Sequence, residues 1–449
     1  MKIIVIGAGA VGLHLARTLS WEGHDVVIID IIQELVDRAA SSMDVLAIRG
    51  SGTSAKLLIE AGAEHADLLI AVTSVDEVNI LACMLAQKLG VKGRIARIRS
   101  HEYSQDDSKV QLSDLGIDQV IHPEMEAARE VAQMIQYPHA IDIVQCAGGK
   151  MFMVGVRVEH DAPIVNIALK DLSPMYPGLP FRIVAIRSGG ETTIPGGFDI
   201  VRSNDLAYII THCENINKIF ELAGKQQMNL KNVMLLGGGM IGRMVAELME
   251  EKKGYHIKMI ESDADKQNRA VQRLKQTIVI KSQGRIDFDV LAIESLDEMD
   301  VFAALTDDDE NNIVTSLFSN HLGVKRIITR ITKPEYMAIA KAIGLEAAIN
   351  ERILTSDAIV KYLLGGRIMA MSTLRGIEAE IIEFAISANS SIAGLTLSEI
   401  DFPDNSIVGA VEHDGEVIVA LGNTMVSPGD RLVMFSDPRS VPKLEKLIN

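Results

Sequence analysis

The sequence predicts an α/β fold with two doubly wound, parallel-sheet domains, each followed by a small α+β domain, in a tandem duplication. Along residues 1–138, short apolar runs rich in β-branched residues alternate with helical patterns. Such alternation is typical of a parallel sheet covered by helices on both faces. The same order of patterns restarts near residue 229. A repeat of about 230 residues indicates copied domains rather than a solenoid array.

The first strand is expected over residues 2–6, an apolar run that leads directly into Gly7-Ala8-Gly9-Ala10-Val11-Gly12. In a dinucleotide-binding turn, the first glycine permits the tight turn and the second lets a pyrophosphate approach the backbone. The third lets helix and strand pack closely. A helix to about residue 19 and a strand over residues 25–29 follow, ending at Asp30. Because a ribose hydroxyl needs an acceptor at this distance from the glycines, the stretch indicates a nucleotide-binding Rossmann domain.

Polar residues follow the later strands of this domain. Further helices are expected over residues 33–41, 56–60 and 76–89, and further strands over 45–48, 68–72, 94–98 and 119–121. Ligands bind outside the carboxyl ends of the strands in such sheets. We therefore expect one site to hold the glycine motif and the residues at the ends of the third, fourth and fifth strands: Gly52, Thr73, Ser74 and Arg97.

From residue 139 the pattern changes to alternating apolar residues and turns rich in glycine and proline. These features predict a small α+β module of roughly 85 residues, too small for a usual catalytic domain. The predicted domains are therefore 1–138 and 139–228 in the first copy, and 229–365 and 366–449 in the second.

The second copy repeats the motif spacing of the first. Its first strand leads into Gly237-Gly238-Gly239-Met240-Ile241-Gly242, and its second strand ends at Glu261. Gly284 corresponds to Gly52. The remaining counterparts of the first-copy residues are Thr306, Asp307 and Arg330.

Composition limits the functions that the chain can have. Of its 449 residues, 48% are hydrophobic and 23% charged, which is typical of a globular protein with a sizeable core. The net charge of -16 argues against a nucleic-acid partner, because phosphates require a basic footprint. The three cysteines are isolated, so we expect a reducing compartment and neither a disulfide framework nor a metal site. We expect a cytosolic protein, because the apolar runs are too short to span a membrane and the first strand leaves no room for a signal peptide.

These features resemble the regulator-of-potassium-conductance (RCK) family. The resemblance rests on the domain order, on KIIVIGAGAVG, and on the patterns A-V-T-S-x-D-E-x-N at residues 71–79, R-I-A-R-I-R at 94–99 and P-G-D-x-L at 428–432. With two copies and no membrane segment, the sequence is similar to the TrkA family, the peripheral nucleotide-binding subunits of Trk potassium-uptake systems. This resemblance covers essentially the whole chain.

The resemblance implies a homotetrameric ring on the cytosolic face of a separate integral membrane potassium-translocating subunit, of the TrkH or TrkG type. Nucleotide in the Rossmann domains would then set the shape of the ring and the conductance of the pore. The implied nucleotide contacts are residues 7–11, Asp30, Thr73, Ser74 and Arg97, and in the second copy residues 237–241, Glu261, Thr306, Asp307 and Arg330.

Asp30 and Glu261 can each accept hydrogen bonds from a vicinal diol and would repel a 2′-phosphate, which favours NAD or NADH over NADP or NADPH. ATP and ADP carry the same free ribose and stay open as ligands. Each motif also has a structural interpretation. The glycines can merely close a turn, the acids that open the following helices can cap them, and Arg97 can form an ion pair in a subunit interface.

An NAD-dependent oxidoreductase is the main alternative function. Hydride transfer needs an acid or base beside the nicotinamide, usually His, Lys or Tyr. His139, His160 and His212 of the first small domain have no counterparts in the second, so no catalytic residue is predicted. A nucleotide-binding scaffold without a channel partner is a third option. Duplicated nucleotide sites without duplicated chemistry favour a regulatory subunit that is not an enzyme.

Overall fold

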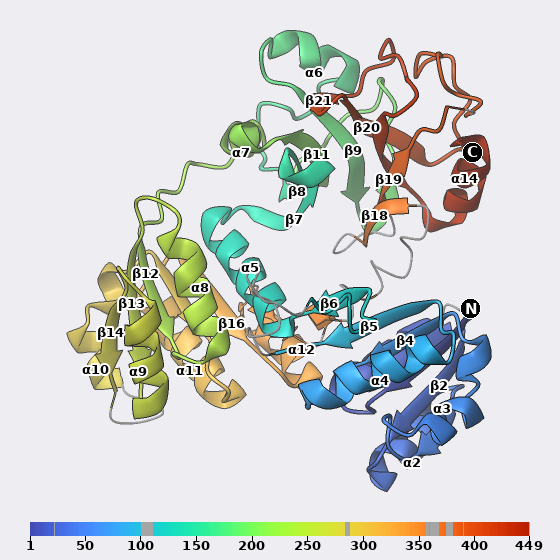
Figure 1. Cartoon of the computed structure of the whole chain (residues 1–449). Helices are drawn as coiled ribbons and strands as arrows, with labels where there is room; N and C mark the ends of the chain where they lie inside the picture. The colour runs from blue at the N-terminus through green and yellow to red at the C-terminus, as the bar shows by residue number, and fades with distance from the viewer. Residues whose placement is uncertain are drawn as a thin grey trace. The chain divides into compact units, whose positions relative to one another are not determined.

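The computed structural model describes residues 1–449 except 22, 100–110, 283–287, 346, 352, 356–358, 360–367, 374–379, 389 and 449. The chain divides into two compact units. Unit 1 holds Met1–Gln136 and Leu230–Ile359, and unit 2 holds Tyr137–Asn229 and Val360–Asn449. Unit 1 gathers the two parallel sheets and unit 2 the two antiparallel sheets, so each unit takes one kind of domain from both copies (Figure 1).

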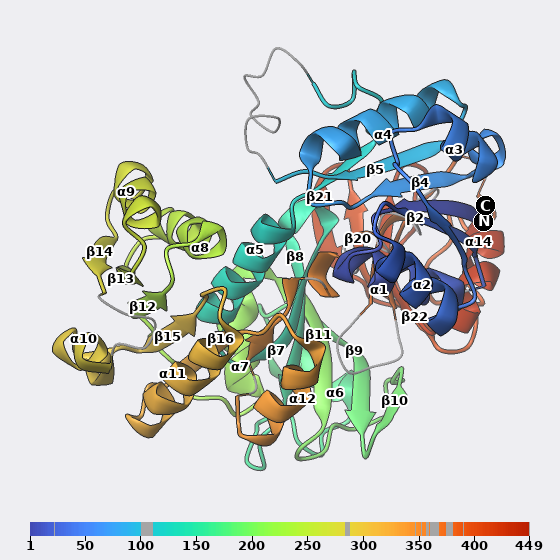
Figure 2. The ribbon, with the colours of Figure 1, turned by 90° about the horizontal axis from the view of Figure 1, so that it is seen from below.

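The first sheet of unit 1 is parallel, with strand order β3-β2-β1-β4-β5-β6. Its central strand β1 is buried on both faces, since Ile3, Ile4 and Val5 have no exposed surface, as the apolar run predicts. Figure 2 shows α3 and α4 over one face of this sheet and α1 and α2 over the other. The strands are β1 (Lys2–Ile6), β2 (Asp25–Asp30), β3 (Leu46–Arg49), β4 (Leu68–Ala71), β5 (Gly93–Arg97) and β6 (Gln119–Ile121). The helices are α1 (Ala10–Trp21), α2 (Gln33–Ser42), α3 (Ala55–Glu60) and α4 (Asp76–Lys88).

The second sheet of unit 1 repeats this order, as β14-β13-β12-β15-β16-β17. Its strands are β12 (Asn232–Leu236), β13 (His256–Glu261), β14 (Ile278–Lys281), β15 (Val301–Ala304), β16 (Arg326–Arg330) and β17 (Ala348–Ile349). Its helices are α8 (Met240–Glu250), α9 (Ala264–Arg273), α10 (Phe288–Ile293), α11 (Asp309–His321) and α12 (Pro334–Ala342). This strand order is that of dinucleotide-binding domains.

Helix α5 (Pro123–Gln136) follows the first sheet in sequence but lies beside α8 of the second domain (Figure 1). Its Ala127, Val131 and Ile135 are buried in one core with Val245 of α8. The helix therefore links the two Rossmann domains, because it follows the first sheet in the chain while its apolar face is buried in the core of the second domain. The domain boundary at residue 138 stays a prediction, and the boundary between 365 and 366 lies outside the described residues.

Unit 2 holds two antiparallel sheets of the same topology, β10-β9-β11-β8-β7 and β18-β19-β22-β20-β21. They share a core that contains Tyr208 and Phe435, both fully buried. The first-copy elements are β7 (Ala140–Cys146), β8 (Met151–Arg157), α6 (Leu169–Met175), β9 (Phe181–Ser188), β10 (Glu191–Thr193), β11 (Leu206–His212) and α7 (Ile216–Leu222). The second-copy elements are β18 (Ile368–Thr373), β19 (Glu380–Ala385), β20 (Ser406–His413), β21 (Glu416–Val419), β22 (Arg431–Ser436) and α14 (Val441–Ile448). The predicted duplication of an α/β and a small α+β domain is therefore confirmed. None of the helices in the described part of the chain is long and apolar enough to cross a membrane.

Candidate functional site

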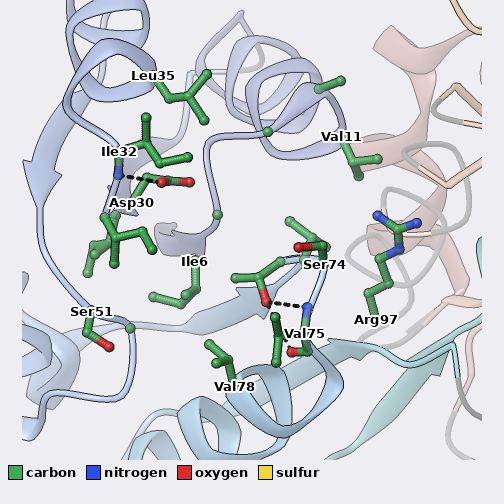
Figure 3. A pocket seen from close by; sticks show the side chains of 18 of the residues that line it. Ile6, Val11, Asp30, Ile32, Leu35, Ser51, Ser74, Val75, Val78 and Arg97 are labelled. Atoms are coloured by element: carbon green, nitrogen blue, oxygen red, sulfur yellow. Dashed lines mark hydrogen bonds between the residues drawn. The ribbon is translucent and has the colours of Figure 1, made fainter.

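A pocket of about 460 Å³ opens at the carboxyl ends of β1, β2, β4 and β5 in unit 1. Figure 3 shows Asp30, Ile32 and Leu35 at one end of this first pocket and Arg97 at the opposite end. The glycine motif runs between these two ends. The pocket therefore occupies the place at which doubly wound sheets bind ligands.

The glycine motif has its tight geometry for steric reasons. Gly7 has φ +103°, and a Cβ there would lie 3.1 Å from the backbone nitrogen of Thr73. A Cβ on Gly12 would lie 1.8 Å from the Gly7 carbonyl oxygen, so only glycine lets α1 begin this close to β1. No described atom lies within 4 Å of the Cβ position of Gly9, which leaves this backbone open to the pocket. The first N–H groups of α1 lack helical partners, so this helix end favours an anion.

Asp30 ends β2 beside the glycine motif. Its Oδ2 accepts a 2.6 Å hydrogen bond from the Ala8 backbone N–H, and its Oδ1 accepts one of 2.9 Å from Ile32 (Figure 3). A carboxylate has about four lone-pair sites. Both oxygens therefore keep acceptor capacity for a vicinal diol, while the two backbone bonds fix the orientation of the group.

Asn79 ties the ends of β4 and β5 together from beneath the pocket. The side chain is fully buried on α4. Its Oδ1 accepts from the Thr73 backbone N–H at 3.0 Å and from the Thr73 hydroxyl at 2.7 Å. Its Nδ2 donates to the carbonyl oxygens of Thr73 at 3.2 Å and Arg97 at 2.8 Å. The Thr73 hydroxyl is therefore held in the turn, and Thr73 contributes to the pocket wall in a fixed conformation.

Arg97 is a largely buried cation with little compensating charge. Its Nη2 lies 3.5 Å from Glu124 Oε1, and its buried Nε has no hydrogen-bond partner among the described residues. Burial lowers the pKa of Arg97 and Arg99 lowers it further, while Glu124 and Glu351 offset only part of this effect. A largely buried guanidinium with so few partners gains from an anionic ligand that accepts its hydrogen bonds.

Five apolar side chains form walls of the first pocket. Ile31, Ile32 and Leu35 follow Asp30, and Val75 and Val78 follow Thr73. Ile31 and Ile32 are 66% and 49% exposed, although both are large apolar residues next to a charged one. Such a slot of aliphatic side chains suits the flat, weakly hydrated face of an aromatic base. Glu351 and Thr355, which follow the second sheet of the same unit, also line this pocket.

The second copy holds a pocket of about 510 Å³ at the corresponding strand ends. Glu261 repeats the arrangement of Asp30, since its Oε2 accepts from the Gly238 N–H at 2.7 Å and its Oε1 from the Asp263 N–H at 2.8 Å. Asn312 repeats the contacts of Asn79, with its Oδ1 bonded to Thr306 and its Nδ2 bonded to the carbonyl oxygens of Thr306 and Arg330. The backbone frame of the two pockets is therefore the same.

Arg330 differs from Arg97 in its partners. Its Nε and Nη2 donate to the two carboxylate oxygens of Glu351 at 3.1 and 3.0 Å. Its Nη1 donates to Asp307 Oδ1 at 2.7 Å and to the Thr306 carbonyl oxygen at 2.9 Å. Burial acts to lower the pKa of Arg330, but the bonded carboxylates outweigh it, so the pKa lies above its ordinary value. This cation is fully compensated by groups of the protein.

The comparisons with known proteins agree with this architecture. The sequence model of the TrkA-N domain matches residues 3–123 and 233–351, and that of the TrkA-C domain matches residues 153–224 and 381–449. The chain belongs to the TrkA family. A Trk system potassium uptake protein TrkA homolog 1 from Methanosarcina mazei is 33% identical over 99% of each chain. The Trk system potassium uptake protein TrkA of Azorhizobium caulinodans is 32% identical over 100% of this chain and 98% of its own.

A solved structure named the GsuK channel bound to NAD has the same fold. Its TM-score is 0.64 at 17% sequence identity, over 100% of this chain and 78% of that chain. At this identity the likeness shows the arrangement of domains that the two chains share.

Most residues predicted for the first TrkA-N domain line its pocket: Gly7, Gly9, Ala10, Val11, Asp30, Gly52, Thr73, Ser74 and Arg97. Ala8 and Gly12 support the pocket without lining it. The Ala8 N–H donates to Asp30, and Gly12 packs against the Gly7 carbonyl oxygen. In the second TrkA-N domain, Gly237, Gly239, Glu261, Thr306 and Asp307 line the pocket. Gly238, Met240, Ile241, Gly242 and Arg330 are not among its lining residues, and Gly284 lies outside the described residues.

The acids that open α4 and α11 do not all cap these helices. Asp308 caps α11 by accepting from the Asn311 N–H at 3.0 Å. Asp76 instead accepts from the Arg99 N–H, and Asp309 from the Thr332 N–H, so both hold the backbone just after β5 and β16. Asp308 is therefore the N-cap of α11, while Asp76 and Asp309 bond to the backbone that follows the neighbouring strand.

Sequence reasoning missed the apolar walls, the anchoring role of Asn79, and the contribution of Glu351. The repeated spacing between Thr73 and Asn79 and between Thr306 and Asn312 was a usable signal. Glu351 gave none, because it reaches the first pocket only through the packing of the two domains.

Proposed function

We propose that this TrkA-family chain is a regulatory subunit of a potassium uptake system, and that the first pocket binds NAD or NADH as a signal. The observation that carries the proposal is the combination within one cavity of an open glycine motif, a diol acceptor, an apolar slot and an undercompensated arginine. These four features suit a pyrophosphate, a ribose, an aromatic base and a second anionic or polar group. The NAD bound to a structure of the same fold supports this ligand.

Asp30 supports NAD and NADH over their 2′-phosphorylated forms. A 2′-phosphate would lie against a carboxylate whose two oxygens are already fixed by backbone N–H groups, and like charges in contact disfavour binding. ADP and ATP present the same ribose and base and are proposed as competing ligands. The predicted contacts of the second copy, Glu261, Thr306, Asp307 and Arg330, stay a prediction.

The chemistry of the first pocket favours a regulator over an oxidoreductase. Among the described residues that line it, none is His, Lys, Tyr or Cys. Asp30 is held by backbone N–H groups at the ribose end, and Glu351 is bonded to Arg330. A hydride transfer would need an acid or base beside the nicotinamide, so we assign the pocket to ligand sensing.

The matching outer faces of α4 and α11 support assembly with further copies of the chain. Leu81 and Met84 on α4 are 43% and 38% exposed, and Val314 and Leu317, at the equivalent positions on α11, are 42% and 36% exposed. Apolar residues exposed at the same positions of both copies suit a repeated contact. We propose a homotetrameric ring, peripherally bound at the cytosolic face of an integral membrane potassium-translocating subunit. Nucleotide would change the conformation of this ring by binding its states with different affinities.

Two measurements test the function. Calorimetric titration of the full chain with NAD, NADH, ADP and ATP should show binding. The Asp30→Ala substitution should lower the affinity by at least about tenfold. Potassium flux through the membrane partner in proteoliposomes should depend on nucleotide. Flux that is the same with and without nucleotide would contradict the regulatory mechanism, and turnover of NADH with a small carbonyl compound would favour the oxidoreductase.

Light scattering tests the ring. Leu81→Glu combined with Val314→Glu should break the assembly into smaller species. Arg38→Glu, a charge change on α2 on the opposite face of the sheet, should leave the mass unchanged. Equal masses for all three chains would refute the assignment of these two faces.

A further inference from the structure

The walls of the two pockets have opposite chemistry although their backbones match. Each of the five apolar wall positions of the first pocket holds a polar or charged residue in the second copy. In order of their counterparts these are Ser262, Asp263, Lys266, Asp308 and Asn311, all of which line the second pocket. An aromatic base placed there would remove water from these polar groups and would gain no apolar contact in return. The second pocket therefore lacks the slot that suits an aromatic base.

Arg330, the counterpart of Arg97, already pairs with carboxylates of the protein. Ser74 of the first copy corresponds to Asp307, which bonds Arg330, and Glu351 holds the other side of the same guanidinium in a bidentate pair. Arg330 would have to break charge-assisted hydrogen bonds before it could meet a phosphate. Within the described part of the chain, the one ion pair of Arg97 is the 3.5 Å contact with Glu124, and its Nε has no hydrogen-bond partner there. Of the two pockets, only the first therefore offers an anionic ligand a poorly paired arginine.

The charge of the lining residues also favours the first pocket as the site for an anion. The described charged residues that line the first pocket are Asp30, Glu351, Arg97 and Arg99, which balance. The second pocket is lined by six carboxylates and two lysines. Lys266 is the one change that adds a positive charge at a wall position, and its Nζ lies 3.3 Å from Asp307 Oδ2. The pyrophosphate of a dinucleotide would therefore meet net repulsion in the second pocket.

We infer that the chain binds one nucleotide, in the first pocket, and that the second pocket keeps the fold of a nucleotide site while Arg330 serves as an internal clamp. The clamp joins the end of β16 to Glu351, and Glu351 in turn forms part of the wall of the first pocket. The second copy thus contributes to the single site as a wall. This inference rests on the proposed function, since it assigns that nucleotide to one of two similar pockets.

Stoichiometry of the full chain tests the inference. Calorimetric titration with NADH should give one site per wild-type chain. Asp30→Ala should bind NADH at least about tenfold more weakly and show no site of wild-type affinity, which would place the second pocket at least about tenfold weaker than the first. Asp37→Ala removes an exposed carboxylate from α2 and should keep one site of unchanged affinity. Thermal melting of each variant confirms that it is folded.

The outcomes separate the two proposals. Two sites of similar affinity in the wild type, or one site that keeps the wild-type affinity in folded Asp30→Ala, would overturn the inference and leave the proposed function standing. Absence of any NADH and ADP binding by the wild type would overturn both.

Discussion

The fully buried Asn79 and Asn312 offer a matched pair of perturbations. Each side chain makes four hydrogen bonds that tie the threonine after one strand to the arginine at the end of the next. Asn79→Ala would leave a backbone N–H and two carbonyl oxygens without these partners. At about 1 kcal/mol for each group, the change should destabilise unit 1 by about 3 kcal/mol. That corresponds to roughly 6–12 °C in melting temperature for a unit of this size.

Because the asparagines are equivalent in structure, Asn312→Ala should lower the melting temperature by a similar amount. Only Asn79→Ala should weaken NADH binding, by at least about tenfold, because it releases Thr73 and the Arg97 backbone from the first pocket. Differential scanning fluorimetry without ligand gives the stabilities, and calorimetry below the melting temperature gives the affinities.

Two results would refute this reasoning. A melting temperature of Asn79→Ala within about 2 °C of the wild type would show that its hydrogen bonds do not hold the strand ends. Equal loss of NADH affinity in both variants would show that the two pockets act as one site or as two equal sites.

Three further predictions concern the first domain and the cysteines. Gly12→Ala should abolish NADH binding and destabilise unit 1, measured by calorimetry and melting, because its Cβ would lie 1.8 Å from the Gly7 carbonyl oxygen; full affinity would contradict the described turn. Asp30→Asn should narrow the preference for NADH over NADPH by about tenfold in competition titrations, since it removes the charge that repels a 2′-phosphate. The exposed thiol of Cys213 should react with a maleimide at pH 8 in the native chain. Cys83 should not react, because burial raises its thiol pKa to about 12; two or more rapidly labelled thiols would be inconsistent with this structure.

The local features of the first site were predictable because they depend on neighbours in sequence. A strand followed by a glycine motif, a helix and an acid defines one βαβ unit, and Gly7 and Asp30 lie where that unit requires. The repeat made the second copy equally visible. The bond between Asp76 and the Arg99 N–H was not predictable, since Arg99 follows β5 and only folding brings the two residues together.

The sequence by itself determined the two Rossmann domains, the small domains between and after them, and the acid, glycine and arginine positions of both copies. These follow from periodicity and from the steric demands of a glycine turn, which act over a few residues. Tertiary structure decided that α5 belongs to the core of the second domain, that Glu351 enters the first pocket, and that Arg330 is bound while Arg97 is poorly compensated. Each of these depends on burial and charge contributed by segments more than a hundred residues apart or by a competing carboxylate, which no local pattern records.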